Sequence, residues 1–213
     1  KGIQMSTKWK TVIVVLTIPL LVQAQIQSFT DQGQIDWNSK TITAIGIGAP
    51  DPNMPAVTAR PMAIRAARSA ALRNAFEIVK GVQINSSTDV KTFMASNDLI
   101  RAQISGFIQT FKESKPRYMR DKAIKIKVTI PFSEGLNESL MPVDIRNIPK
   151  MHQESKSATQ SWTGLIIDAR GMKVTPAIAP KIVDSNGKEI YGSAYVSRAF
   201  AKKWGMVGYA KSR

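Results

Sequence analysis

The clearest alternation of apolar and polar positions lies between residues 122 and 132. β-Branched apolar residues occupy every second position of this segment: Ile124, Ile126, Val128 and Ile130. A period of two places these side chains on one face of a β-strand and the intervening ones on the other. Because Lys125 and Lys127 are among the intervening residues, the pattern predicts a strand with one buried face and one solvated, basic face.

Residues 57–80 show the three- and four-residue spacing that is typical of an amphipathic helix. The apolar side chains that recur at this spacing are Met62, Ala66, Leu72, Phe76 and Val79. Repeated alanines raise the helix propensity, and Gly81 follows where a helix C-terminus favours glycine. We therefore expect one long helix that packs on a sheet and carries arginines on its remaining faces.

Trp37–Gly48 also predicts a strand, because it is rich in β-branched residues and alternates in polarity. The polar residues 25–34 before it predict only a loose lead-in. Three prolines between residues 50 and 55 end any regular element, since proline cannot donate to a ladder or continue a helix.

The segment between residues 97 and 111 allows two interpretations. Asn97 and Asp98 could cap a short helix, whereas Gly106 and the β-prone residues after it favour a strand that begins near Gln103. We favour the strand. On that interpretation Ile104–Phe111 pairs with Ala123–Phe132 as a long hairpin.

The last third of the chain has shorter patterns. Trp162–Asp168 predicts a strand, and Asp184–Gly187 predicts a hairpin turn between Ala179–Val183 and Lys188–Tyr191. A short basic segment, Ser197–Trp204, follows. The sequence thus predicts an α+β fold: a long helix packed on an antiparallel sheet in residues 25–150, a polar linker over residues 151–161, and a smaller β-rich unit over residues 162–213.

Residues 1–24 have the pattern of a secretory signal peptide. Lys8 and Lys10 precede an apolar run over residues 11–22, and Ala24 offers a small residue for cleavage. This run of twelve residues is shorter than the roughly 20 that a membrane-spanning helix needs. We expect Met5 as the start, cleavage after Ala24, a periplasmic location and no transmembrane anchor after cleavage.

The formal net charge of +15 favours anionic partners. Because an exported protein rarely meets nucleic acid, we expect an anionic envelope surface or an envelope protein instead, although such a charge also serves solubility. The sequence contains no cysteine, which excludes disulfides, thiol catalysis and a lipid anchor on an N-terminal cysteine.

Motifs for catalysis, metals or cofactors are weak. Gly46 and Gly48 follow a strand, but the third glycine of a dinucleotide fingerprint is absent and prolines replace the helix start. His152 is the only histidine and lies in the polar linker, away from any candidate nucleophile. We expect no catalytic residue, no metal and no cofactor.

Two pairs of residues are candidate ligand-binding residues. Arg65 and Arg68 lie one turn apart on the long helix, and Asp168 and Arg170 end an apolar strand. A solvated helix face and a structural ion pair are the alternatives for these two pairs.

Four segments together resemble known bacterial families: I-G-I-G-A-P (45–50), R-P-M-A-I-R-A-A-R-S-A-A-L-R-N-A-F-E-I-V-K-G-V (60–82), K-I-K-V-T-I-P-F (125–132), and the segment 163–192 with its G-L-I-I-D-A-R-G motif. The first three resemble the LPP-twenty lipoprotein family and the N-terminal domain of flagellar assembly protein T. The fourth looks like a C-terminal extension of exported relatives. The resemblance implies a non-enzymatic envelope or flagellum-associated component with a helix on an antiparallel sheet.

We expect a non-enzymatic exported envelope protein that acts by binding, as an accessory to envelope or flagellar assembly or to the outer membrane. One alternative is an enzyme that acts on an anionic envelope glycan through Asp168 with Glu189 or Asp184. Another is a structural subunit that self-associates by pairing exposed strand edges.

Overall fold

The computed structural model of the 213-residue chain describes residues 26–28, 31–131, 137, 139–140 and 165–210. The strands are β1 (Ile26–Ser28), β2 (Gly33–Asp36), β3 (Thr41–Gly48), β4 (Lys112–Glu113), β5 (Arg117–Tyr118), β6 (Ile124–Pro131), β7 (Ile182–Val183) and β8 (Glu189–Tyr191). The helices are α1 (Ala56–Lys80), α2 (Val90–Ala95), α3 (Asp98–Ile108), the short 3₁₀ helix η2 (Ser193–Tyr195) and α5 (Arg198–Trp204). The expected leader and linker lie outside the described residues.

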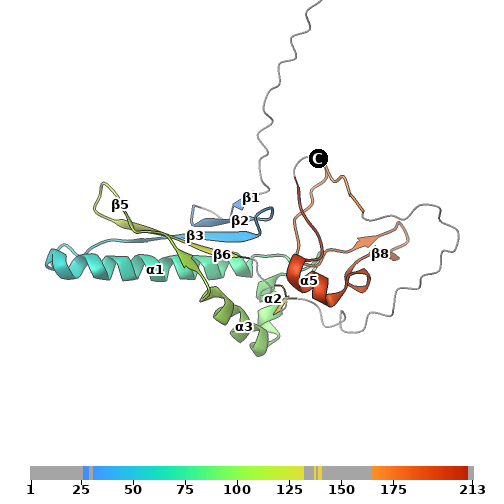
Figure 1. The fold of residues 1–213 in the computed structure, drawn as a ribbon, viewed down its shortest axis with the longest axis horizontal. Coiled ribbons are helices and arrows are strands. Elements are labelled where there is room, and N and C mark those ends of the chain that lie inside the picture. The colour runs from blue at the N-terminus through green and yellow to red at the C-terminus, as the bar shows by residue number, and fades with distance from the viewer. Residues whose placement is uncertain (1–25, 29–30, 132–136, 138, 141–164, 211–213) are drawn as a thin grey trace, which may run out of the picture.

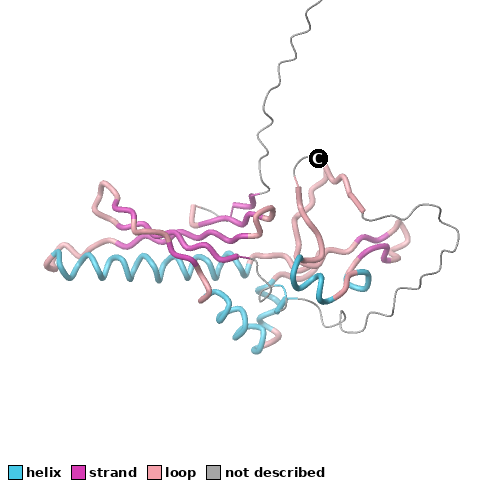
Figure 2. The backbone as a smooth tube through the Cα atoms, in the orientation of Figure 1, coloured by secondary structure: helices cyan, strands magenta, loops and turns pink. Residues whose placement is uncertain are grey.

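A six-stranded antiparallel sheet forms the centre of the molecule. Its order is β1-β2-β3-β6-β4, and β5 also pairs with β6. The longest ladder joins β3 to β6 over eight residue pairs, from Thr41 opposite Pro131 to Gly48 opposite Ile124. The helix α1 runs along one side of these two strands (Figures 1 and 2). The α+β fold class, a long helix on an antiparallel sheet followed by a small two-stranded sheet, is therefore confirmed.

The face that α1 buries is mainly a stripe of alanines. Of the apolar residues that the sequence analysis selected, Val79 is buried, and Leu72 and Phe76 are partly buried against the core. Every fourth residue is buried, and these residues are Ala59, Ala63, Ala67, Ala71 and Ala75. Met62 and Ala66 are exposed instead. The reason is the close approach of the helix to β3, which leaves room only for methyl groups.

Gly46 and Gly48 on β3 make this close approach possible. A Cβ atom at Gly46 would overlap the Ala67 carbonyl oxygen and the Ala71 amide nitrogen, and one at Gly48 would overlap the Ala63 carbonyl oxygen. The side-chain Nδ2 of Asn74 also donates to the Ile45 carbonyl at 2.7 Å. The glycines that resembled part of a nucleotide-binding fingerprint are thus packing residues.

The expected strand from Gln103 to Phe111 is wrong, because α3 extends from Asp98 to Ile108. The Asn97 side chain accepts a hydrogen bond from the Ile100 amide and caps this helix. Burial of Ile104, Phe107 and Ile108 on one helix face outweighs the β-propensity of the segment and the cost of Gly106. The strand β6 instead pairs with the two-residue strands β4 and β5.

Residues 25–34 are not simply a loose lead-in, because β1 and β2 extend the sheet there. Only Ile35 of β2 supplies a large buried side chain, so the apolar pattern of this edge is too sparse to indicate a strand.

The C-terminal segment packs against the first part of the chain. Ile178 and Ala179 donate backbone hydrogen bonds to the carbonyls of Gln83 and Ile84 at 3.0 and 2.8 Å. The Tyr209 ring packs edge-on against Trp37, with centroids 5.4 Å apart. Buried residues of both parts consequently belong to one hydrophobic core.

Within this segment, the hairpin turn at Asp184 is confirmed between β7 and β8, where Asp184 accepts hydrogen bonds from the amides of Asn186 and Lys188. The expected strand over Trp162–Asp168 is wrong for its described part, since residues 165–168 pair with no strand and are exposed. The basic segment after Ser197 forms α5. Across the described residues, the helices are too short or too polar to span a bilayer.

Candidate anion-binding face

The side of the sheet that faces away from α1 carries the basic residues of β6. Ile124, Ile126, Val128 and Ile130 are buried beneath α1, so Lys125 and Lys127 project to the opposite side, as the sequence predicts. In the ladder to β3, Lys125 lies opposite Ile47 and Lys127 lies opposite Ile45. Ile47 is 53% exposed, which adds an apolar position to this face.

The strand β5 adds a second row of positive charge on the other flank of β6. Arg117 lies directly opposite Lys125. Directly opposite residues of an antiparallel pair project on the same face, and two like charges in that position destabilise the pair. Lys112 of β4 lies opposite Thr129 and projects on the same face. We call Lys112, Arg117, Lys125 and Lys127 the basic face.

A tight turn joins β5 to β6. The Lys122 amide donates to the Met119 carbonyl at 3.1 Å, and the Met119 amide donates to the Ala123 carbonyl at 2.8 Å. Lys122 has a φ of 66°, in the left-handed region that favours glycine. We call Tyr118–Lys122 the hairpin tip; Tyr118 is 61% exposed and Met119 39%.

Among the residues that the structure describes, the cations of this region have no acidic partners. Residues 112–127 contain seven basic residues: Lys112, Lys115, Arg117, Arg120, Lys122, Lys125 and Lys127. Their side chains form no ion pair or hydrogen bond with the rest of the described chain. Of the two acids of the segment, Glu113 binds Arg68 on α1, and Asp121 accepts a hydrogen bond from the Ala123 amide within the turn. Cations therefore outnumber carboxylates in this segment, and none of the seven is paired within the described part of the chain.

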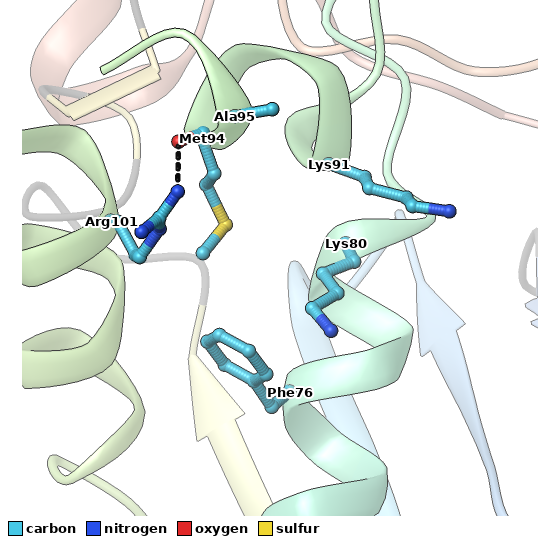
Figure 3. A pocket seen from close by; sticks show the side chains of 6 residues that line it. All are labelled: Phe76, Lys80, Lys91, Met94, Ala95 and Arg101. Carbon is cyan, nitrogen blue, oxygen red and sulfur yellow. Dashed lines mark hydrogen bonds between the residues drawn. The ribbon is translucent and has the colours of Figure 1, made fainter. Parts of the chain in front are cut away.

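A pocket of about 250 Å³ between α1, α2 and α3 is also lined by cations. Figure 3 shows its lining residues: Phe76, Lys80, Lys91, Met94, Ala95 and Arg101. Lys80 lies 2.8 Å from Glu77 and packs over the Phe76 ring, and Arg101 binds Asp98 and the Met94 carbonyl. Lys91 extends away from the Phe76 ring (Figure 3). Since two of its three charges are paired, this pocket attracts anions less than the basic face does.

Of the two arginines predicted to bind a ligand on α1, Arg68 is bound to β4. Its guanidinium donates to both carboxylate oxygens of Glu113, at 2.6 and 3.1 Å, and this bidentate contact raises the pKa of Arg68. Arg65 is exposed and has no partner among the described residues. The structure therefore does not join the two side chains in one site.

Asp168 and Arg170 form an exposed ion pair with each other. The Arg170 guanidinium contacts both Asp168 oxygens, and its backbone amide donates to the same carboxylate. The hydrogen bonds from Arg170 lower the pKa of Asp168. This pair belongs to the C-terminal segment, whereas Arg65 and Arg68 lie in the middle part of α1.

The sequence analysis found the basic side of β6 but missed Arg117, Lys112 and the hairpin tip. Residues 112–121 are rich in charge and contain Pro116, which is typical of a loop, and nothing in that pattern indicates which strand Arg117 lies beside. A run of cations next to an amphipathic strand was the one available signal. As for metals, the described residues contain no group of three histidine, aspartate or glutamate side chains suited to hold an ion.

Comparison with protein families gives two matches. The family model of the N-terminal domain of Treponema pallidum Tp0624 matches residues 28–138, which is more than half of the chain. The model of the second domain of Tp0624 matches residues 164–213. No curated protein matches the chain.

These matches correct the resemblance to the LPP-twenty lipoproteins and to flagellar assembly protein T. That resemblance rested mainly on an alanine- and arginine-rich helix and an amphipathic strand. Any fold that packs a helix closely on a sheet needs small residues on the helix and alternation in the strand, so such segments do not distinguish one family from another.

Proposed function

The chain belongs to the family of the Treponema pallidum Tp0624 N-terminal domain, and from that premise we propose that it is a non-enzymatic binding module that attaches to an anionic surface of the bacterial envelope through its basic face. The leader predicted in residues 1–24 supports a site of action outside the cytoplasm. The partner supplies negative charge, and the protein supplies a rigid sheet that presents cations.

The pair formed by Arg117 and Lys125 carries this proposal. Proteins usually place opposite charges or neutral residues across a strand pair, because like charges there cost stability. Here two cations face each other, Lys127 lies two positions along β6, and the nearby Glu113 is held by Arg68 on the α1 side. A bound anionic surface would remove the repulsion.

The test compares two triple variants that lose the same charge. The face variant carries Arg117→Gln, Lys125→Gln and Lys127→Gln. The control carries Arg60→Gln, Arg65→Gln and Arg73→Gln, three exposed arginines of α1. Each cation near an anionic lipid surface contributes about 1 kcal/mol, so we expect the face variant to bind vesicles of phosphatidylglycerol and phosphatidylcholine, and dextran sulfate, at least tenfold more weakly than wild type.

We expect the control variant to stay within about threefold of wild type in co-sedimentation and in retention on dextran sulfate. An equal loss in both variants would mean that net charge alone causes binding, and the proposal would then be wrong. The control also tests the ligand-binding role predicted for Arg65.

The enzyme alternative has less support from the geometry. A general acid needs a carboxyl group with a raised pKa, but the bonds from Arg170 lower the pKa of Asp168. Asp184 holds a turn through the amides of Asn186 and Lys188, which explains its position without a catalytic role.

Self-association is a second candidate, favoured by one observation. Leu165, Ile166 and Ile167 are three consecutive apolar residues, and all are exposed, with Ile166 at 79%. Such a segment suits pairing with the same segment of a second copy. Light scattering should then show a dimer or larger species. Ile166→Lys should dissociate it, whereas Leu99→Lys, at another exposed apolar position, should not. A wild-type protein that stays monomeric at high concentration would contradict self-association.

A further inference from the structure

The hairpin tip differs from the rest of the basic region because it carries large apolar side chains. Tyr118 and Met119 are both exposed there, and neither is covered by another part of the described chain. In Figure 1 the hairpin at β5 rises from the sheet on the side away from α1. Tyr118 lies opposite Ile124, so its side chain projects from the other side of the hairpin than those of Arg117 and Lys125. The tip would therefore enter a surface end-on, with cations on one side of the hairpin and Tyr118 on the other.

We infer that this tip inserts Tyr118 and Met119 into the interfacial layer of an anionic lipid bilayer, so that the anionic surface is a lipid surface. The inference rests on the proposed function, because it assumes that the basic face binds the surface and adds what that surface is.

The composition of the tip matches the chemistry of a bilayer interface. Tyrosine has an apolar ring and a polar hydroxyl, and it is enriched at the level of the lipid head groups. Methionine is flexible and fits irregular apolar surroundings such as acyl chains. Burial of two such side chains contributes a few kcal/mol at most, which is enough for reversible attachment only together with cations.

Cations flank these two side chains along the chain, and Asp121 is the one acid within the hairpin tip. Arg120 and Lys122 follow Met119 in the turn, and Arg117 precedes Tyr118. Long basic side chains place their apolar stems along the interface and their charged ends at phosphates. A soluble acidic polymer offers only charge, so it would leave Tyr118 and Met119 with no apolar partner.

Lys122 gives the tip a further property. A left-handed residue in a tight hairpin turn is commonly glycine, yet a lysine with a φ of 66° occupies this position. The chain thus tolerates backbone strain and keeps a cation beside Met119. Lys40, between β2 and β3, also has a positive φ, of 52°, so the backbone conformation alone does not distinguish the tip; what Lys122 adds there is its charge.

The absence of cysteine from the sequence allows a direct test. In the full-length chain, Met119→Cys labelled with the polarity-sensitive fluorophore NBD is compared with Ile190→Cys carrying the same label. Ile190 is 53% exposed and lies on β8, so it has similar access to solvent but lies far from the tip (Figure 1). With vesicles that contain phosphatidylglycerol, we expect a blue shift and at least a twofold rise in emission at position 119 and no change at 190.

An unlabelled variant separates the contribution of side-chain insertion to vesicle binding from the contribution of charge. We expect Tyr118→Ser with Met119→Ser to bind phosphatidylglycerol vesicles at least fivefold more weakly than wild type and to bind dextran sulfate equally well. Far-UV circular dichroism and the melting temperature check that the variant is folded.

The outcomes distinguish this inference from the proposed function. Suppose that the face variant loses binding, but that the label at position 119 keeps the emission it has in water when the labelled protein is bound to vesicles. The inferred insertion is then wrong, and the proposed function stands. Equal binding of the double serine variant to vesicles would likewise overturn the insertion. If wild type binds neither vesicles nor dextran sulfate, the proposed function itself fails.

Discussion

Single atoms set the distance between α1 and the sheet. Glycines on β3 face alanines on α1, and a methyl group at Gly46 would meet main-chain atoms of Ala67 and Ala71 rather than the ends of flexible side chains. Main-chain atoms cannot move aside without displacing the whole helix. The packing is therefore intolerant of added volume at this place, and we expect that intolerance to be measurable.

Gly46→Ala should lower the free energy of unfolding by about 3 kcal/mol, because overpacking a closed contact strains the backbone. Urea denaturation followed by circular dichroism measures this. The matched control is Gly106→Ala in α3, where a Cβ meets nothing within 4 Å. It should raise stability by about 0.5–1 kcal/mol, since alanine favours a helix over glycine. A neutral Gly46→Ala would contradict the described contact.

Lys122 supplies a second prediction at the residue scale. Its left-handed backbone conformation costs a non-glycine residue about 1 kcal/mol. Lys122→Gly should therefore raise the free energy of unfolding by about that amount and weaken binding to anionic vesicles. Lys115→Gly, which removes a nearby charge without a left-handed conformation, should not be stabilising; a gain there as well would exclude backbone strain as the cause.

At the scale of elements, long and strongly periodic segments were predictable. The helix from residue 56 to 80, the strand β6 and the turn at Asp184 all follow from local pattern and capping. The face that α1 buries was not predictable from its largest apolar residues. That face depends on Gly46 and Gly48, which lie on another element and act only through the fold.

The errors also have physical causes. At residues 97–111, β-propensity favoured a strand, but the Asn97 cap and a buried face gave the helix α3. Residues 165–168 have high β-propensity, but they lie beside no partner strand and therefore form no ladder. For the candidate site, Lys125 and Lys127 could be assigned to a basic face from alternation alone, while Arg117 required the register of a hairpin whose turn uses lysine in place of glycine.

The contact between the C-terminal segment and the first part of the chain rests partly on Tyr209. Its hydroxyl accepts a hydrogen bond from the Ala177 amide at 2.8 Å and donates one to the Ala177 carbonyl at 2.7 Å, and burial raises the pKa of Tyr209. Tyr209→Phe leaves a buried amide unpaired and should cost about 1–3 kcal/mol. Hydrogen exchange should show faster loss of protection at Ala177.

The control for this prediction is Tyr195→Phe. The Tyr195 hydroxyl donates to the Glu189 carbonyl at 3.3 Å and is exposed, so its removal should change stability by less than about 0.5 kcal/mol. Equal losses of stability for the two substitutions would mean that the Tyr209 hydroxyl does not stabilise the contact of the C-terminal segment with the rest of the chain.

At the scale of the whole molecule, the hydrophobic core is shared. Ile178, Val196 and Met206 of the C-terminal segment belong to the same buried cluster as Ile35 and Trp37. Parts that share a core unfold together when neither can bury its apolar surface alone. The two matched family regions are therefore expected to behave as one cooperative unit.

Equilibrium unfolding in urea should accordingly show a single transition, with the same midpoint by tryptophan fluorescence and by far-UV circular dichroism. Two separated midpoints would mean that the regions 28–138 and 164–213 fold independently despite their contacts. The Tyr209→Phe variant should keep the single transition and lower its midpoint.

The contact of glycine with alanine between β3 and α1 constrains how this protein can diverge. A descendant that acquires a side chain at Gly46 must shift its helix outward and refill the gap, which requires larger residues at 67 and 71 in the same lineage. Substitutions at these three positions should therefore occur together among homologues, and a sequence with only one of them should be rare.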